Sequence, residues 1–271
     1  ALIGARPVFA DVLDDQNISP KAIEAAITKN TKAIMPVHLT GHCANMPEIL
    51  EIGRRHGIPV IEDAAQAVLA SVDGMVAGSA GLINSFSLHP LKNLNAAGDA
   101  GILTTNDDAL AAKLKLMRNH GLKNRDDILF WGYNSRLDTL QAAILRVRLP
   151  RLKSYIEKRR ANAARYIRGL DAVVQCPIER ANEFHTYHVF VIQCDRRDEL
   201  QKCLADAGVE TKIHYPIPIH LQEAASSLGH RKGDFPKTEA QAGRILSLPV
   251  HQYLTSDQID WTIETIKKFY N

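Results

Sequence analysis

Segments typical of β-strands alternate with segments typical of α-helices along the first half of this chain, and this alternation limits the possible folds most strongly. Short apolar runs predict strands at 7–12, 32–38, 60–63, 83–88 and 100–104. Helices are expected at 21–29, 46–56 and 109–118. Ser19 would cap the first of them, with Pro20 at its first position. The pattern predicts an α/β fold: a mostly parallel sheet flanked by helices.

The pattern changes after Leu137. The segment 139–149 is apolar on one face, and 152–170 reads as a long helix rich in Arg, Lys and Ala that would suit a linker. A smaller α+β unit follows, with strands expected at 187–193 and 210–214 and helices at 197–207, 237–245 and 256–270. The sequence therefore predicts a large domain at 1–148, then a linker helix and small C-terminal domain at 149–271.

Composition excludes several classes of protein. The 271 residues include 33 basic and 30 acidic side chains that are interspersed, with a net charge of +3, so no basic stripe indicates nucleic acid. No segment approaches the length of a membrane span. The four cysteines (Cys43, Cys176, Cys194 and Cys203) lack CxxC spacing, so a zinc site or a disulfide framework is not expected. Reduced thiols in a cytoplasm fit this pattern better.

Lys92 and Asp63 are the residues that best indicate chemistry. Asp63 ends the strand at 60–63, and Lys92 lies in the loop after the strand at 83–88. In parallel sheets ligands bind outside the carboxyl ends of the strands, where both residues fall. Pyridoxal 5′-phosphate (PLP) needs a lysine amine that forms an imine and a carboxylate beside its pyridinium nitrogen. The alternatives are a pair of surface charges or, for Asp63, a helix N-cap.

Three more side chains near this pair suit the same cofactor. Gln66 could donate to the phenolic oxygen of the ring, and the hydroxyl of Ser87 could bind the phosphate. A serine in a strand is, however, more often a satisfied hydroxyl without a function. His89 is similarly ambiguous, because a lone histidine is more often a structural hydrogen-bonding residue than an acid or base.

Three longer blocks of sequence, at 62–67, 85–93 and 132–143, follow one another along the chain. Shorter blocks continue the pattern at 4–9, 36–41, 214–220 and 246–249. Together they resemble the signature blocks of the DegT/DnrJ/EryC1/StrS family, which are PLP-dependent nucleotide-sugar aminotransferases of fold type I. The likeness spans nearly the whole chain. It implies an enzyme of amino sugar and polysaccharide biosynthesis that converts a nucleotide-linked keto sugar to an amino sugar.

The resemblance also implies a role for each candidate residue. Lys92 would be the Schiff-base lysine and proton shuttle. Asp63 would pair with the pyridinium nitrogen, Gln66 with the ring hydroxyl and Ser87 with the phosphate. Asn134 would reach the phosphate of the cofactor in the partner subunit, which implies a homodimer with shared active sites.

The remaining roles concern the substrate. Arg136 would support the phosphate or the interface, while His220, Tyr215 and His89 would face the sugar nucleotide. Transamination would be ping-pong, with glutamate as the amino donor. Family members with histidine at the Lys92 position run dehydration instead, so the lysine favours an aminotransferase. The block from Asn134 to Gln141 resembles members that act on 3-keto sugars more than those that act on 4-keto sugars.

Two alternatives stay open. One is a PLP-dependent sugar dehydratase or synthase of the same family. The other is a truncated, non-catalytic family member, because the family pattern places roughly a hundred residues before Gly4, including a phosphate loop and a stacking aromatic. On this reading the large domain is N-terminally incomplete, and we expect a dimer that binds PLP weakly or not at all and exposes apolar surface where the missing elements would pack.

Overall fold

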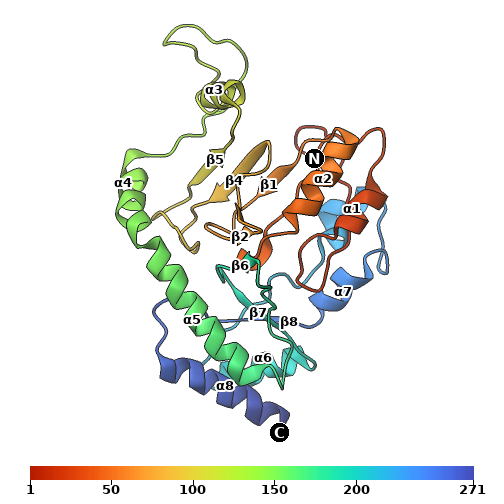
Figure 1. The fold of residues 1–271 in the computed structure, drawn as a ribbon, viewed down its shortest axis with the longest axis vertical. Coiled ribbons are helices and arrows are strands. Elements are labelled where there is room, and N and C mark those ends of the chain that lie inside the picture. Colours follow the sequence, from red (N-terminus) through yellow and green to blue (C-terminus); the bar gives the residue numbers. More distant parts are fainter.

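The computed structural model describes residues 1–271 and contains the expected mostly parallel sheet (Figure 1). β1 (Ile61–Asp63) pairs in parallel with β4 (Ile83–Ser87), and β5 (Gly101–Thr104) adds an antiparallel edge. On the other side of β1, the segment 34–37 runs parallel to it through two isolated bridges. This confirms the α/β prediction, and it places the carboxyl ends of β1 and β4 at the same edge of the sheet.

Helices lie on either side of this sheet (Figure 1), and they start where the sequence predicts. The first three are α1 (Pro20–Ala26), α2 (Met46–His56) and α3 (Asp108–Met117). The hydroxyl of Ser19 accepts a hydrogen bond from the backbone N–H of Ala22 at 3.3 Å, which is N-capping. α2 ends at Gly57, whose φ of 64° lies in the left-handed region that glycine adopts without strain.

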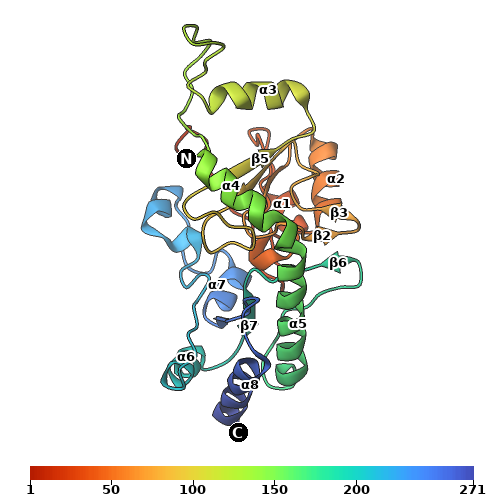
Figure 2. The ribbon, with the colours of Figure 1, turned by 90° about the vertical axis from the view of Figure 1, so that its left-hand side faces the viewer.

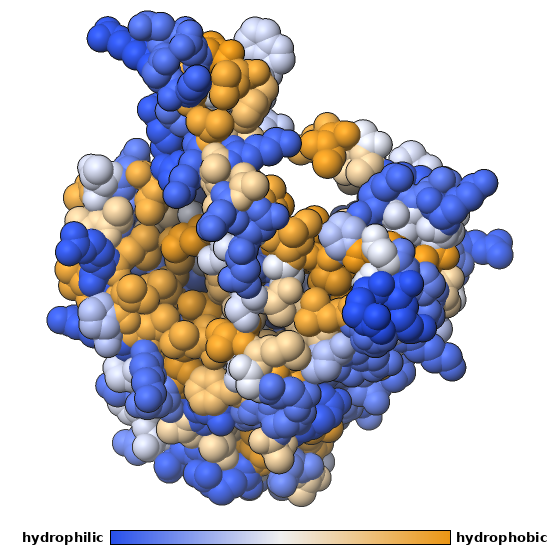
Figure 3. Space-filling model, turned by 45° about the horizontal axis from the view of Figure 1, so that its top comes forward, coloured by the Kyte–Doolittle hydropathy of each residue, from blue (hydrophilic) through white to orange (hydrophobic).

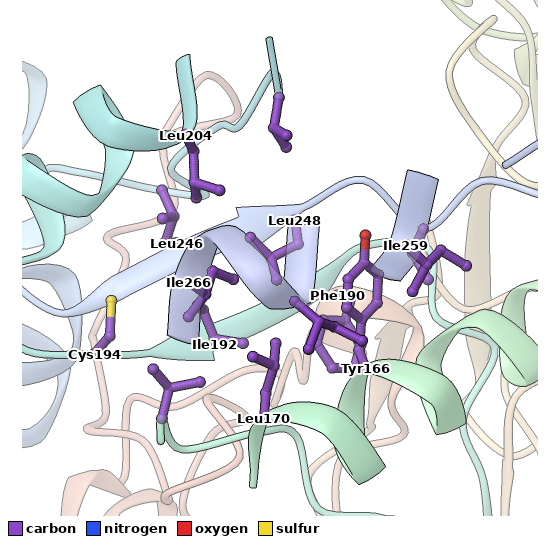
Figure 4. Close-up of a cluster of buried hydrophobic side chains, with 14 of the residues drawn as sticks. Tyr166, Leu170, Phe190, Ile192, Cys194, Leu204, Leu246, Leu248, Ile259 and Ile266 are labelled. Carbon is purple, nitrogen blue, oxygen red and sulfur yellow. The ribbon is translucent and has the colours of Figure 1, made fainter. Parts of the chain in front are cut away.

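The C-terminal part is built around two antiparallel strands, β7 (Phe190–Gln193) and β8 (Ile245–Leu248). The helices that complete this part are α4 (Thr139–Arg148), α5 (Leu152–Leu170), α6 (Arg197–Asp206), α7 (Pro236–Ala242) and α8 (Ser256–Tyr270). Tyr166 from α5, Leu204 from α6 and Ile266 from α8 pack against β7 and β8 (Figure 4). Burial of these side chains is the main favourable term in the stability of this unit.

Two separate hydrophobic cores accompany this arrangement. All 17 buried residues of the larger core come from 163–266, and all 14 of the second core come from 23–77. A smaller cluster of 6 residues packs three side chains of the segment 88–96 against Leu145 of α4 and Leu152 and Ile156 of α5. This distribution is compatible with a division near residue 148, which stays a prediction.

A three-stranded sheet that the sequence did not predict joins the two parts. β2 (Ser71–Val72) pairs with β3 (Met75–Val76) on one side and with β6 (Glu183–Phe184) on the other. Strands of two residues are too short to produce an alternating pattern in the sequence. The remaining short elements are single-turn or two-turn 3₁₀ helices: η1 (Leu39–Gly41), η2 (Leu149–Arg151), η3 (Ile219–Leu221) and η4 (Glu223–Leu228).

The strand expected at 7–12 is wrong, since this segment pairs only through a bridge between Val12 and Ile18. It caps another element instead. The carboxylate of Asp11 accepts hydrogen bonds from the backbone N–H of Lys237 at 3.1 Å and of Thr238 at 2.9 Å. The N–H groups of a first helical turn have no partner within the helix, so this carboxylate satisfies the start of α7.

The predictions around β8 also need correction. The helix expected at 237–245 ends at Ala242, because residues 245–248 form β8 and pair with β7. The strand expected at 210–214 is reduced to a single bridge between Lys212 and Ser247. All four residues of β8 are buried, and a short, continuously apolar run does not distinguish a strand from a buried helix.

One segment extends away from the body of the protein (Figures 1 and 2). α3 has no buried residue, and the loop 119–138 after it exposes Ile128, Leu129, Trp131 and Tyr133. We call residues 119–138 the arm. Apolar residues also gather on the face drawn in Figure 3. None of the helices is both long and apolar enough to cross a bilayer.

Candidate active site

A cleft of about 660 Å³ lies between the loop that carries Lys92 and the C-terminal part of the chain. The N-terminal part contributes Lys92, His89 and Gln66 to its walls. The residues of the opposite wall that bear on the chemistry are Arg159, His188, Lys212, His214, Tyr215 and His251. A concave site with several convergent polar groups is the expected form of a small-molecule site. Basic groups predominate on both walls.

Lys92 has the electrostatic environment of a reactive amine. Its side chain is half-buried, and burial lowers its pKa below the ordinary lysine value, while the negative charge of Asp63 opposes this shift. Lys92 makes no salt bridge, so its amine is free to react. Because the neutral amine is the nucleophile, a lowered pKa increases the reactive fraction at neutral pH.

Asp63 and Ser87 end neighbouring parallel strands, as the sequence indicates. In Asp63, Oδ1 accepts a hydrogen bond from the backbone N–H of Ala65 at 3.0 Å, and Oδ2 has no hydrogen-bond partner. The residues that follow form turns rather than a helix, so Asp63 is not a helix N-cap. The hydroxyl of Ser87 accepts from the backbone N–H of His89 at 3.3 Å. Neither residue lines the cleft of Lys92 in this structure.

Gln66 is oriented by a backbone contact. Its Oε1 accepts a hydrogen bond from the N–H of Thr40 at 2.7 Å. With the oxygen engaged, the amide nitrogen of Gln66 is left to donate. Gln66 lines the cleft, so the chemistry it presents there is that of a hydrogen-bond donor.

The strand that carries Asp63 is held by a buried carboxylate one residue earlier. Glu62 and His38 are both fully buried, and Nε2 of His38 donates to Glu62 at 2.8 Å. Nδ1 of His38 accepts from the N–H of Ala44, which leaves the proton of a neutral ring on Nε2. Glu62 also accepts from the backbone N–H groups of residues 78, 80 and 81 at 2.6–2.8 Å.

The remaining predicted site residues are not all brought together. His89 and Tyr215 line the cleft with Lys92. Asn134 and Arg136 are exposed on the arm, where Nε of Arg136 donates to Oδ1 of Asn134 at 2.9 Å. His220 is buried outside the cleft lining and bonds to Glu239 at 3.0 Å.

Five of the cleft residues that bear on the chemistry were missed by sequence reasoning: Arg159, His188, Lys212, His214 and His251. His214 begins one of the sequence blocks, and Nδ1 of its ring lies 2.8 Å from the hydroxyl of Ser247. Arg159 is one of several basic residues on α5, and no sequence signal distinguishes it from the exposed ones. Only the packing of α5 against the cleft separates them.

Lys92 is half-buried close to the carboxylate of Asp63, at the strand ends of a mostly parallel sheet. This arrangement is typical of enzymes that act on carbonyl and amine groups. Comparison with known proteins agrees. The family model "DegT/DnrJ/EryC1/StrS aminotransferase family" matches residues 1–267. This chain belongs to the DegT/DnrJ/EryC1/StrS aminotransferase family.

Individual relatives are similar over most of their length. The chain is 44% identical to a pleiotropic regulatory protein of Geobacillus stearothermophilus, covering all of this chain and 74% of that protein. It is also 44% identical to the UDP-N-acetyl-3-dehydro-α-D-glucosamine 3-aminotransferase of Acidithiobacillus ferrooxidans, covering 95% of this chain and 70% of the relative. A solved family aminotransferase from Brucella abortus matches with a TM-score of 0.96 at 36% identity, covering 100% of this chain and 75% of that one.

The Glu62 contacts generate a prediction about stability and pH. Burial alone would raise the pKa of Glu62, but hydrogen bonds from His38, Gly78 and Gly81 outweigh it, so the net pKa is lowered. A lowered folded-state pKa stabilises the protein above the unfolded-state pKa, near 4.3, and this contribution is lost as pH falls through the folded-state value. Glu62→Gln should lower the free energy of unfolding at pH 7 by about 3–5 kcal/mol in urea titrations.

The pH dependence separates this effect from a general loss of packing. The difference in unfolding free energy between wild type and Glu62→Gln should shrink as the pH falls below about 4. Glu51→Gln is the matched control, because Glu51 pairs with Arg54 on the surface, and it should change stability little. Equal effects of the two substitutions at pH 7 would contradict the structural role of Glu62.

Proposed function

We propose that this chain is a PLP-dependent aminotransferase that converts a nucleotide-linked keto sugar to an amino sugar. The observation that carries the proposal is the half-buried Lys92, whose pKa is lowered by burial and which feels the charge of Asp63, at one wall of a large cleft. Membership of an aminotransferase family supports it. A dehydratase is disfavoured because the lysine is retained.

The residues present fit the cofactor. Lys92 would hold PLP covalently, and the unpartnered Oδ2 of Asp63 would accept a hydrogen bond from the pyridinium nitrogen. The amide nitrogen of Gln66 would donate to the ring hydroxyl, and Ser87 would bind the phosphate. When bound, PLP supplies an electron sink that stabilises negative charge on the carbon next to the amino nitrogen.

The chain's own contribution to the chemistry is proton transfer at Nζ of Lys92. A lysine whose pKa is lowered by burial can take a proton from carbon and return it within the same cleft. The basic groups of the cleft walls, among them Lys92 and Lys212, suit an anionic substrate such as a nucleotide diphosphate sugar. We propose glutamate as the amino donor.

The position of the keto group is proposed to be C3. The block from Asn134 to Gln141 favours this position, and the Acidithiobacillus ferrooxidans relative is named for a 3-dehydro sugar.

The four cysteines are all free, and Cys43 and Cys194 are buried, which suits a reducing compartment and supports a place in the cytoplasm.

The partner proposed for the arm is a second copy of this chain. Trp131 is 93% exposed, and Ile128, Leu129 and Tyr133 are more than half exposed beside it, so the chain's own body does not cover them. Exposed apolar clusters of this kind commonly mark protein interfaces. Asn134 is also part of the arm. If the arm packs on a second subunit, it would bring the side-chain amide of Asn134 to the partner's site.

Lys92→Ala should abolish covalent capture of PLP. Wild type incubated with PLP and then borohydride should carry a stable adduct on the peptide that contains residue 92, measured by mass spectrometry and by the cofactor's absorbance. The exposed Lys153 provides the control Lys153→Ala, which should behave as wild type. A reducible adduct in Lys92→Ala would show that another amine holds the cofactor.

Asp63→Asn keeps the shape of the side chain and removes its charge. We expect normal folding by circular dichroism and a loss of turnover of roughly 100- to 1000-fold, because a neutral amide no longer favours a protonated ring nitrogen. Asp206→Asn, at an exposed position that does not line the cleft, is the control. Turnover of Asp63→Asn within about twofold of wild type would refute the proposed role.

Trp131→Asp tests the assembly. Wild type should sediment as a dimer, and a charge placed in the apolar patch of the arm should shift the protein toward monomer without changing its circular dichroism. Tyr253→Asp, at a position that is 71% exposed outside the arm, is the control and should leave the dimer intact. A monomeric wild type would contradict the shared site.

A further inference from the structure

Arg159 is a buried cation without a counterion. Its side chain is 8% exposed, and no carboxylate lies within salt-bridge distance of it. Its hydrogen bonds go to neutral acceptors only: Nε donates to Gln252, and Nη1 donates to the backbone oxygens of Tyr187 and His188, each at 3.1 Å. Buried charges in proteins are normally paired, so this one calls for a partner.

The electrostatics of Arg159 agree with a missing anion. Burial lowers the pKa of Arg159 to about 10, with a small opposing effect from Tyr253. The guanidinium is still protonated at neutral pH, so its charge persists at a desolvation cost that no carboxylate of the chain offsets. The only acidic residue in the cleft lining, Glu210, is already 2.9 Å from Lys212 at the exposed rim.

A second polar group without a partner lies on the same wall. Nδ1 of His188 is buried and has no hydrogen-bond partner, and both His188 and Arg159 line the cleft that contains Lys92. The pKa of His188 is lowered to about 3 by burial and then by the charges of Lys92 and Arg159, so its ring is neutral at pH 7. A neutral ring still carries one N–H donor.

We propose that Arg159, with His188 beside it, forms a subsite that binds a carboxylate of the amino donor. This inference rests on the proposed function and names the part of the cleft that takes the donor. Nε and Nη1 are already engaged, so Nη2 offers the remaining N–H pair, which suits one small, planar acid. A diphosphate would need several donors, and this buried guanidinium has only the N–H pair of Nη2 left.

Glutarate, an unreactive dicarboxylate, tests the subsite without any catalytic step. Titration calorimetry at fixed ionic strength, on protein without added PLP, should detect binding to wild type. Arg159→Gln should weaken it by about tenfold or more, because charged hydrogen bonds are lost. Lys212→Gln and Lys158→Gln remove the same charge from the cleft rim and from the exposed face of α5, and they should bind glutarate within about twofold of wild type.

Arg159 also bonds two backbone oxygens, so Arg159→Gln could disturb the wall, and Arg159→Lys provides a second test. Arg159→Lys keeps the charge but not the planar donor pair, so its glutarate affinity should fall between those of wild type and Arg159→Gln. Neutral glutaramide should not bind wild type. Equal glutarate binding by wild type and Arg159→Lys, or equal losses in Arg159→Gln and Lys212→Gln, would overturn the subsite.

Uridine monophosphate and inorganic phosphate are the comparison probes. Their binding should be unchanged in Arg159→Gln; a loss for them but not for glutarate would assign Arg159 to the sugar nucleotide and overturn the carboxylate proposal. A wild type that captures PLP on Lys92 but ignores glutarate would overturn the subsite and leave the proposed function standing. A wild type that binds glutarate but captures no PLP would overturn the proposed function and leave the carboxylate subsite standing.

Discussion

The carboxylate of Glu62, buried at the centre of the N-terminal part, receives hydrogen bonds from His38 and from three backbone N–H groups of residues 78–81. These donors come from two segments far apart in the sequence, and Glu62 itself lies on β1. A buried charge is tolerated only when its hydrogen bonds are complete, so the three segments must keep their relative places. The geometry of the strand end that carries Asp63 depends on this interaction.

The alternation of a strand then places two neighbouring carboxylates in different environments. Side chains of consecutive residues point to opposite faces of the sheet, so Glu62 is enclosed while Asp63 is only partly buried and keeps one oxygen without a partner. One carboxylate supports the fold, and the next is available for chemistry. Lys92 lies on the loop after β4, the strand that pairs in parallel with β1. Because neighbouring parallel strands end at the same edge of the sheet, Lys92 comes close enough to Asp63 for the negative charge of the carboxylate to oppose the lowering of the lysine pKa by burial.

The cleft lies between two parts of the chain that each have their own hydrophobic core, and contacts at several points join these parts. The amide of Asn93 donates to the backbone oxygen of Thr186 at 3.2 Å, which ties the lysine loop to the segment before β7. Arg159, which lies on α5, donates to the backbone oxygens of Tyr187 and His188, the two residues that follow Thr186. The wall that carries His188 is therefore fixed from both sides, and a ligand would meet preorganised donors rather than mobile side chains.

Local chemistry along the sequence determined the helices with clear caps, the strands at β1, β4 and β5, and the pairing of Lys92 with Asp63 at strand ends. Each of these depends on neighbours in the chain: Ser19 caps α1, and Gly57 ends α2. Tertiary structure decided the rest. The carboxylate of Asp11 caps α7 across more than two hundred residues, and β8 is a strand because β7 pairs with it. Arg159 resembles any other basic residue of α5 in the sequence; only packing buries it beside the cleft without a counterion, because burial and pairing are properties of the whole fold.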